Sequence, residues 1–99
     1  MKKVYKLSGL VNRFPMEIAW YYVYVPREIT DEIFTKINLR ATPFRFMPIE
    51  AELEGIKWNT ALLPHGKKQF FIPVKKDVRK KTFVDLGDKV EISFSLRGV

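Results

Sequence analysis

Apolar and polar residues alternate most regularly in the second half of the chain, and this pattern predicts β-strands. Residues 49–53 place isoleucine, alanine and leucine on one face and glutamates on the other. Glu54-Gly55 fits a two-residue hairpin turn, in which the glycine supplies a positive φ. Residues 56–63 alternate again and are expected to form the return strand, with its polar residues near the glutamates. We therefore expect a β-hairpin with one face in the core and one face in water.

The stretch from residue 70 to residue 96 changes its period twice, which predicts a strand, a helical turn and a second strand. Residues 70–74 are apolar, residues 75–81 are mostly lysine and arginine, and residues 90–96 return to strict alternation. The tetrapeptide Leu86-Gly87-Asp88-Lys89 is expected to form the tight corner before the last strand. Glycine can take a positive φ at such a corner, and aspartate can bond to the neighbouring backbone.

Two further strands are predicted nearer the N-terminus. Residues 4–12 alternate loosely around Gly9, which predicts a bulge or a barrel bend at that glycine. Residues 17–25 are dense in aromatic and β-branched residues, and both faces of that strand would be apolar. One face is therefore expected in the core and the other beneath a helix or a partner, although such an aromatic patch could also stack on nucleic-acid bases.

Residues 27–37 carry apolar side chains at helical spacing, so the principal helix is expected there. Either Pro26 or Thr30 could mark its start, because proline ends the preceding strand and threonine can cap a helix. Asp31 and Glu32 would lie at or near the first turn, where the helix dipole favours carboxylates. We interpret these two acids as part of the helix start and not as an acid–base pair, because adjacent helical residues do not face each other.

Together these elements predict a mainly β fold in a single domain over residues 1–99. The expected architecture is a small six-stranded β-barrel, closed or nearly closed, with one principal α-helix and a short basic helical turn. A chain of this length buries roughly 60 to 70% of its unfolded surface around one core. The residues expected in that core are Trp20 or Tyr21, Phe34, Leu53, Trp58, Phe70 or Phe71, Ile92 and Phe94.

The composition removes several classes of function. The chain has no cysteine and a single histidine among its 99 residues, which excludes disulfides, thiolate nucleophiles and zinc sites built from cysteine or histidine clusters. The longest apolar run, residues 18–25, is too short for a bilayer-spanning helix, so we expect a cytoplasmic protein without a membrane partner. His65 is the one side chain suited to proton transfer near neutral pH, and we interpret it as an exposed loop residue. We accordingly expect no catalytic residue, no metal and no cofactor, and an enzyme is the less favoured class.

Charge is the one functional signal in the sequence. The formal net charge is +7, from 18 Lys and Arg against 11 Asp and Glu. Residues 67–81 combine a single acid, Asp77, with the seven basic residues of a candidate polyanion-binding site: Lys67, Lys68, Lys75, Lys76, Arg79, Lys80 and Lys81. A focused basic patch attracts polyanions through counterion release, without any reading of bases. The same residues could serve only to keep a small barrel soluble, so the sequence leaves both interpretations open.

The order of these motifs resembles a known family. The strand ending in YYVYVP, the segment GIKWNTALLPHGKKQFFIPVKKDVRKK and the closing LGDKVEISFSL resemble the prokaryotic domain of unknown function numbered nineteen-oh-five, over nearly the whole chain. The matching positions are turn and core residues: Pro26, Gly55, Thr60, Leu62, Pro64, Gly66, Val78, Arg79, Gly87 and Asp88. The chain departs from the expected pattern after the basic helical turn, where it has Thr82-Phe83-Val84 and a glycine is expected.

The resemblance implies a double-split β-barrel, in the same broad fold group as the swapped-hairpin DNA-binding domains of bacterial transition-state regulators and antitoxins. It implies no known active site. In some family members the domain is joined to a second one associated with bacteriocin protection, and residues 1–99 contain nothing that resembles that second domain. We therefore expect a non-catalytic binding module for a small molecule or a protein, with nucleic-acid or other polyanion binding through residues 67–81 as the alternative. The oligomeric state, monomer or homodimer, stays open.

Overall fold

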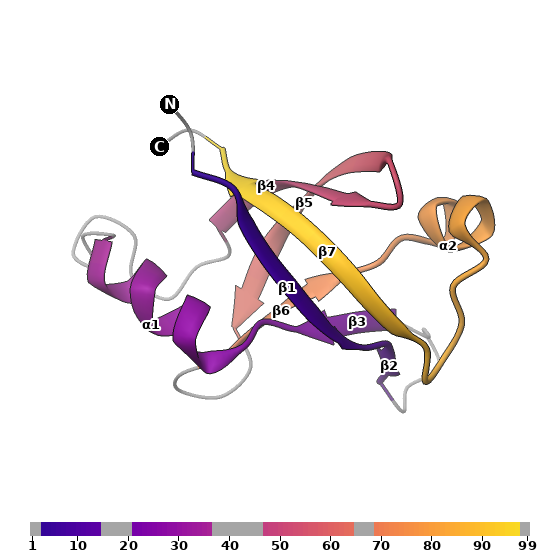
Figure 1. Ribbon diagram of the computed structural model, residues 1–99, viewed down its shortest axis with the longest axis horizontal. Helices are drawn as coiled ribbons and strands as arrows, with labels where there is room; N and C mark the ends of the chain where they lie inside the picture. Colours follow the sequence, from indigo (N-terminus) through magenta and orange to yellow (C-terminus); the bar gives the residue numbers. More distant parts are fainter. Residues whose placement is uncertain (1–2, 15–20, 37–46, 65–68, 98–99) are drawn as a thin grey trace.

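Strands dominate the structure, a computed structural model that describes residues 3–14, 21–36, 47–64 and 69–97. Within these residues seven strands pair antiparallel in the order β1-β7-β4-β5-β6-β3-β2 (Figure 1). Their bounds are β1 Tyr5–Leu10, β2 Asn12–Arg13, β3 Tyr21–Tyr24, β4 Met47–Leu53, β5 Ile56–Pro64, β6 Phe70–Pro73 and β7 Lys89–Leu96. Two helices, α1 (Arg27–Lys36) and α2 (Lys76–Thr82), lie at opposite ends of the barrel. No helix in the described part of the chain is long and apolar enough to cross a bilayer.

One continuous stretch of chain closes the barrel. β1 pairs with β7, and after a single residue, Val11, the chain continues as β2, which pairs with β3. Backbone hydrogen bonds extend the first pairing to the bend: Val11 N donates to Asp88 O (2.9 Å), and Gly87 N donates to Val11 O (2.9 Å). Because both ends of the strand order belong to this one stretch, the sheet wraps into a nearly closed barrel.

The predicted mainly β barrel is confirmed, with a seventh, two-residue strand beyond the six expected. The alternation predicts one strand over residues 4–12 with a bulge or bend at Gly9. The structure places Gly9 within β1, where a Cβ would lie only 2.9 Å from Val23 Cγ1, so the glycine lets β1 pass close to β3. The bend follows at Val11, and β2 beyond it is the additional strand.

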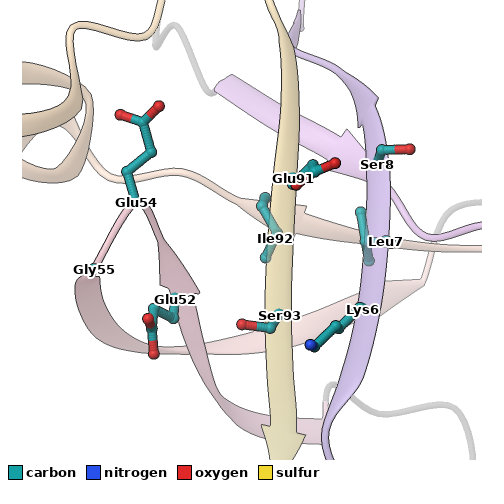
Figure 2. Close-up of a pocket in the computed structure, with 9 residues that line it drawn as sticks. All are labelled: Lys6, Leu7, Ser8, Glu52, Glu54, Gly55, Glu91, Ile92 and Ser93. Carbon is teal, nitrogen blue, oxygen red and sulfur yellow. The ribbon is translucent and has the colours of Figure 1, made fainter.

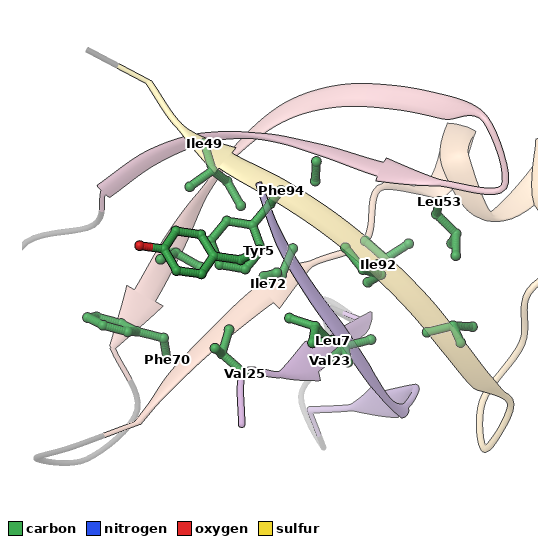
Figure 3. Close-up of a cluster of buried hydrophobic side chains, with 14 of the residues drawn as sticks. Tyr5, Leu7, Val23, Val25, Ile49, Leu53, Phe70, Ile72, Ile92 and Phe94 are labelled. Carbon is green, nitrogen blue, oxygen red and sulfur yellow. The ribbon is translucent and has the colours of Figure 1, made fainter. Parts of the chain in front are cut away.

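Alternate residues of the longer strands fill the interior of the barrel (Figure 3). On β4, Ile49, Ala51 and Leu53 are buried, which confirms the predicted inward face of the hairpin. The Tyr5 ring stacks on Phe94, with ring centroids 5.2 Å apart, and so joins β1 to β7 within the core. Of the expected core residues, Leu53, Trp58, Phe70, Ile92 and Phe94 belong to the core, Tyr21 packs against it, and Trp20 and the Phe34 side chain lie outside the described part.

The hairpin turn between β4 and β5 is confirmed. Glu54 and Gly55 both have positive φ, 49° and 82°, as a two-residue turn that matches the twist of the flanking strands requires. The resulting register places Glu52 opposite Lys57, so charges of opposite sign face each other on the outer surface.

α1 begins directly after Pro26, and this decides between the two starts that the sequence allows. Thr30 N donates to Pro26 O (3.0 Å), and Thr30 Oγ1 donates to the same carbonyl (3.2 Å). Thr30 is therefore a fully buried residue within the helix, and the alternative in which it caps the helix start is wrong. Ile33 is also buried, and an ion pair between Lys3 and Glu32 fastens α1 beside the beginning of β1.

Several sequence predictions fall outside the described residues. They concern the first part of the aromatic strand (residues 17–20), the helix end at Ile37, and the loop that contains His65 and Gly66. These stay predictions.

The outward face of β3 and β6 carries a second aromatic group, here called the outer aromatic cluster: Phe14, Tyr22, Tyr24 and Phe71. Phe14 and Tyr22 stack with centroids 4.2 Å apart, and Phe71 meets both rings edge-on at 5.3 Å. Tyr22 and Phe71 are buried, although they do not belong to the main core. The second face of this strand is thus apolar and its rings pack on one another, while the expectation that a helix or a partner covers it stays a prediction.

The corner before β7 is also confirmed. Gly87 has a φ of 86°, and Asp88 Oδ2 accepts a hydrogen bond from Asp85 N (2.9 Å). Asp85 Oδ1 in turn accepts from Leu86 N (2.7 Å). Since Gly87 N also bonds Val11, the corner holds the bend that closes the barrel.

We expect Gly87→Val to lower the free energy of unfolding by about 1 to 3 kcal/mol. A Cβ at Gly87 would meet no atom within 4 Å, so the loss comes from forcing a β-branched residue to positive φ and not from a clash. Urea denaturation followed by tryptophan fluorescence measures the change. Gly87→Asn is the matched control, because asparagine tolerates this conformation and should lose much less. An unchanged midpoint for the valine variant would show that the corner does not need glycine.

Tyr22 should ionise only in strong alkali, well above the ordinary pKa of a tyrosine. Its hydroxyl donates to the Tyr24 hydroxyl (3.3 Å), and this bond together with burial raises the pKa of Tyr22 to about 12. A phenol whose pKa rises on folding stabilises the native state below its unfolded pKa of about 10, and this contribution is lost as the pH rises from about 10 to about 12. Phenolate absorbance should therefore show a late step that Tyr22→Phe removes. Tyr5→Phe is the control, because burial also raises the pKa of Tyr5. A late step that persists in Tyr22→Phe would disprove the assignment.

Candidate functional site

The basic helical turn expected from the sequence is α2, and the barrel fixes its orientation. Before the helix, Val74 N donates to Tyr21 O (2.9 Å), which ties the chain to the first residue of β3. Val78 and Thr82, four residues apart, are buried and define the inner face of the helix. Thr82 Oγ1 donates to Val78 O (2.8 Å), so this buried hydroxyl is satisfied within the helix. Val78 therefore points into the core of the barrel.

Four lysines share the remaining surface of α2 and its N-cap with Arg79 and the exposed Asp77. Lys76 and Lys80, four residues apart, project opposite the buried face, with Lys75 and Lys81 on the flanks, and all four are exposed. None of their side chains has an ion-pair partner among the described residues. Lys80 and Lys81 lie in the last turn, where the helix dipole favours positive charge. We call these four residues the lysine face.

Arg79 has a different role from its neighbours. Its guanidinium lies 3.7 Å from the centre of the Tyr21 ring, and its Nε donates to Val74 O (3.3 Å). The Tyr21 ring belongs to β3, and the Val74 carbonyl belongs to the segment that leads into the helix. The cation–π contact and the hydrogen bond therefore hold α2 against the barrel. Sequence spacing groups Arg79 with Lys76 and Lys80, and no sequence signal identifies Tyr21 as its partner.

The remaining two residues of the predicted site, Lys67 and Lys68, lie outside the described part of the chain. The structure therefore brings together five of the seven predicted residues, and it separates them into one anchor, Arg79, and the lysine face.

Phe83 ends α2 in an unusual conformation. It is the C-cap residue, with φ 59° and ψ 28°, in the left-handed region that glycine usually occupies at this position. Its side chain is 89% exposed, and Leu86 nearby in the sequence is 54% exposed. Sequence reasoning missed Phe83 as a functional candidate. The available signal was the phenylalanine at a point where the family resemblance leads one to expect a glycine.

A recess of about 740 Å³ lies between the end of α2 and the tip of the β4–β5 hairpin. It is lined by Leu53, Glu54, Thr82, Phe83, Val84, Asp88, Lys89, Val90 and Glu91. Phe83 thus forms one wall of a surface depression whose polar residues are mostly acidic. The recess and the lysine face adjoin the same helix and differ in charge.

A second recess, of about 500 Å³, lies on the outer face of β1, β7 and β4 (Figure 2). Lys6 on β1 lies opposite Ser93 on β7, and Ser93 lies opposite Glu52 on β4, so these three side chains form one row across the strands. Glu54 and Glu91 line both recesses. The glutamates fan along the outer surface, and the described residues contain no group of three or more His, Asp or Glu side chains placed to hold a metal ion.

The fold and the site define a mainly β, nearly closed barrel that carries an exposed lysine-bearing helix at one end. The chain belongs to the family described as Domain of unknown function (DUF1905), whose family model matches residues 9–94. The match covers most of the chain and confirms the resemblance seen in its turn and core residues. No curated protein matched the chain.

Replacing Phe83 with glycine should stabilise the protein by about 0.5 to 1 kcal/mol. Phenylalanine contributes little packing at 89% exposure, and a left-handed residue with a Cβ is strained by about 1 to 2 kcal/mol. Glycine removes this strain, but it also gives the unfolded chain more conformational freedom, and this offsets part of the gain in stability. Thermal and urea denaturation measure the gain. Leu86→Gly is the matched control, because Leu86 is exposed but does not have positive φ, and it should not stabilise. Destabilisation by Phe83→Gly would show that the ring makes contacts that matter to folding.

Proposed function

We propose that this protein is a binding module that holds a polyanion on the lysine face of α2. The observation that carries the proposal is the arrangement of this helix. One face is fixed in the barrel by Val78 and Thr82, while four exposed lysines without ion-pair partners among the described residues outnumber Asp77, the one acid of the helix, on the rest. A short helix with a buried anchor presents its charges at fixed positions, which suits contacts with a regular array of anionic groups.

The physical basis is the release of counterions. Each lysine that neutralises a phosphate frees a condensed cation from a polyanion, so binding strengthens steeply as salt falls. The formal net charge of +7 adds long-range attraction to this local effect. Arg79 supports the site indirectly, because its contacts with Tyr21 and Val74 keep α2 in place.

The recess beside Phe83 favours a second candidate, a small molecule or a protein segment. Its volume of about 740 Å³ lies within the range of ligand sites, and Leu53, Phe83, Val84 and Val90 give it apolar walls. A ligand held there would bind with little dependence on salt and would raise the melting temperature of the protein. Polyanion binding is the first choice, because both recesses are open at the surface and the lysine face has no other partner in the described structure.

The triple substitution Lys76→Gln, Lys80→Gln and Lys81→Gln tests the proposal. With labelled single-stranded oligonucleotides or inorganic polyphosphate, the slope of log affinity against log salt should fall in magnitude by about 2, since each phosphate contact on a single strand contributes about 0.7. Fluorescence anisotropy at several salt concentrations measures the slope. Arg79 is left unchanged, so that α2 stays anchored.

The matched control removes the same amount of charge elsewhere. Lys6→Gln, Arg27→Gln and Arg97→Gln alter three exposed residues away from α2, and this variant should keep the wild-type slope apart from a small general loss of attraction. Equal losses in the two triple variants would mean that net charge alone drives binding and that the lysine face is not a site. The absence of saturable binding by the wild type near 100 mM salt would reject the proposal outright.

A further inference from the structure

An exposed aromatic ring stands at the end of the lysine-bearing helix. Phe83 follows Lys80 by three residues and Lys81 by two, and its side chain is 89% exposed. We propose that the polyanion is a single-stranded nucleic acid, with Phe83 stacked on one base while Lys80 and Lys81 contact the adjoining phosphates. This inference rests on the proposed function and adds to it the class of ligand.

The state of Phe83 is difficult to explain by folding alone. Single apolar residues on a surface need no special explanation, but Phe83 combines near-complete exposure with a strained left-handed backbone. A glycine or an asparagine would be less strained at the end of α2 and would expose no apolar surface. A phenylalanine that contributes little to the core and strains the backbone is the arrangement expected of a residue that contacts a ligand.

The spacing fits a single strand. Lys80 and Lys81 lie in the last turn of α2 and Phe83 caps it, so the ring and both charges fall within about one helical pitch of 5.4 Å, which is comparable with the spacing of about 3.4 Å between successive nucleotides of a stacked strand. One lysine can therefore reach the phosphate beside the stacked base, and the other can reach the next. Aromatic rings beside basic side chains are the usual means by which proteins bind single strands without reading their sequence, because every base has a π-face.

The acidic recess determines on which side of Phe83 the phosphates of the nucleic acid would lie. The depression that Phe83 helps to line contains three acids, Glu54, Asp88 and Glu91, against the single Lys89, and this net negative charge would repel phosphates that approached there. The phosphates are thus favoured on the lysine face, and the base is favoured over the ring. A duplex does not present the faces of its bases in this way, so binding of a single strand should exceed binding of a duplex of the same length.

The test compares Phe83→Ala with the wild type on three probes: a single-stranded oligonucleotide, the corresponding duplex, and inorganic polyphosphate, which has no bases. Affinity for the single strand should fall by about 5- to 100-fold, while the salt slope stays unchanged. Affinities for the duplex and for polyphosphate should change little. Phe83→Trp should retain binding of the single strand, and Leu86→Ala should not affect it.

The outcomes separate this inference from the proposed function. If the lysine variant loses salt-dependent binding to all three probes but Phe83→Ala changes none of them, the lysine face is a polyanion site and the stacking proposal is wrong. Equal losses on the single strand and on polyphosphate would also overturn it, because the ring would then act through the shape of α2 and not through a base. If the wild type binds none of the probes, both proposals fail together.

Discussion

The bend at Val11 is the constraint on which the barrel depends. Val11 is almost completely buried, and both its backbone N–H and its carbonyl are bonded to the corner at Gly87 and Asp88. One stretch of chain can therefore leave β7 and join β3 without exposing a buried polar group at the junction. The same bonds fix the start of β7, and hence the end of the segment that returns from α2. Closure of the barrel and placement of the candidate site thus share one set of contacts.

Local patterns in the sequence predicted the elements well, because they report which side of a strand is buried and where the backbone must turn. The β4–β5 hairpin followed from alternation and from Gly55, and the corner followed from Gly87. The switch from β7 to β3 could not be predicted in this way, since alternation does not say which strand lies alongside. Gly9 shows the same limit: the pattern marked an irregularity, but its cause is the approach of Val23 from another strand.

The candidate site was predicted as a set of equivalent basic residues, and only the fold shows that Arg79 contacts the barrel while the lysines face solvent. Arg79 and Lys80 are neighbours in sequence with the same formal charge, yet the guanidinium of Arg79 is committed to Tyr21 and to the carbonyl of Val74. Both contacts depend on how β3 and β6 bring the chain to the start of α2, which is a tertiary relation with no local signature. A planar guanidinium suits such a stacked position better than an ammonium, which explains why an arginine stands there among lysines.

The basic residues of α2 have two separate roles: Arg79 holds the helix against the barrel, and the lysine face stays exposed. A helix of seven residues is too short to be stable alone, so the inner face and Arg79 must hold it in place. Once it is held, the lysines are not needed for folding contacts and stay available to solvent. The helix end shows the same separation between folding contacts and exposed groups. Phe83 adds little to the core, and a glycine at this position would leave the backbone less strained. Stability thus comes from the inner face of α2, while the outer face and the C-cap stay exposed, as the proposed binding of a polyanion requires.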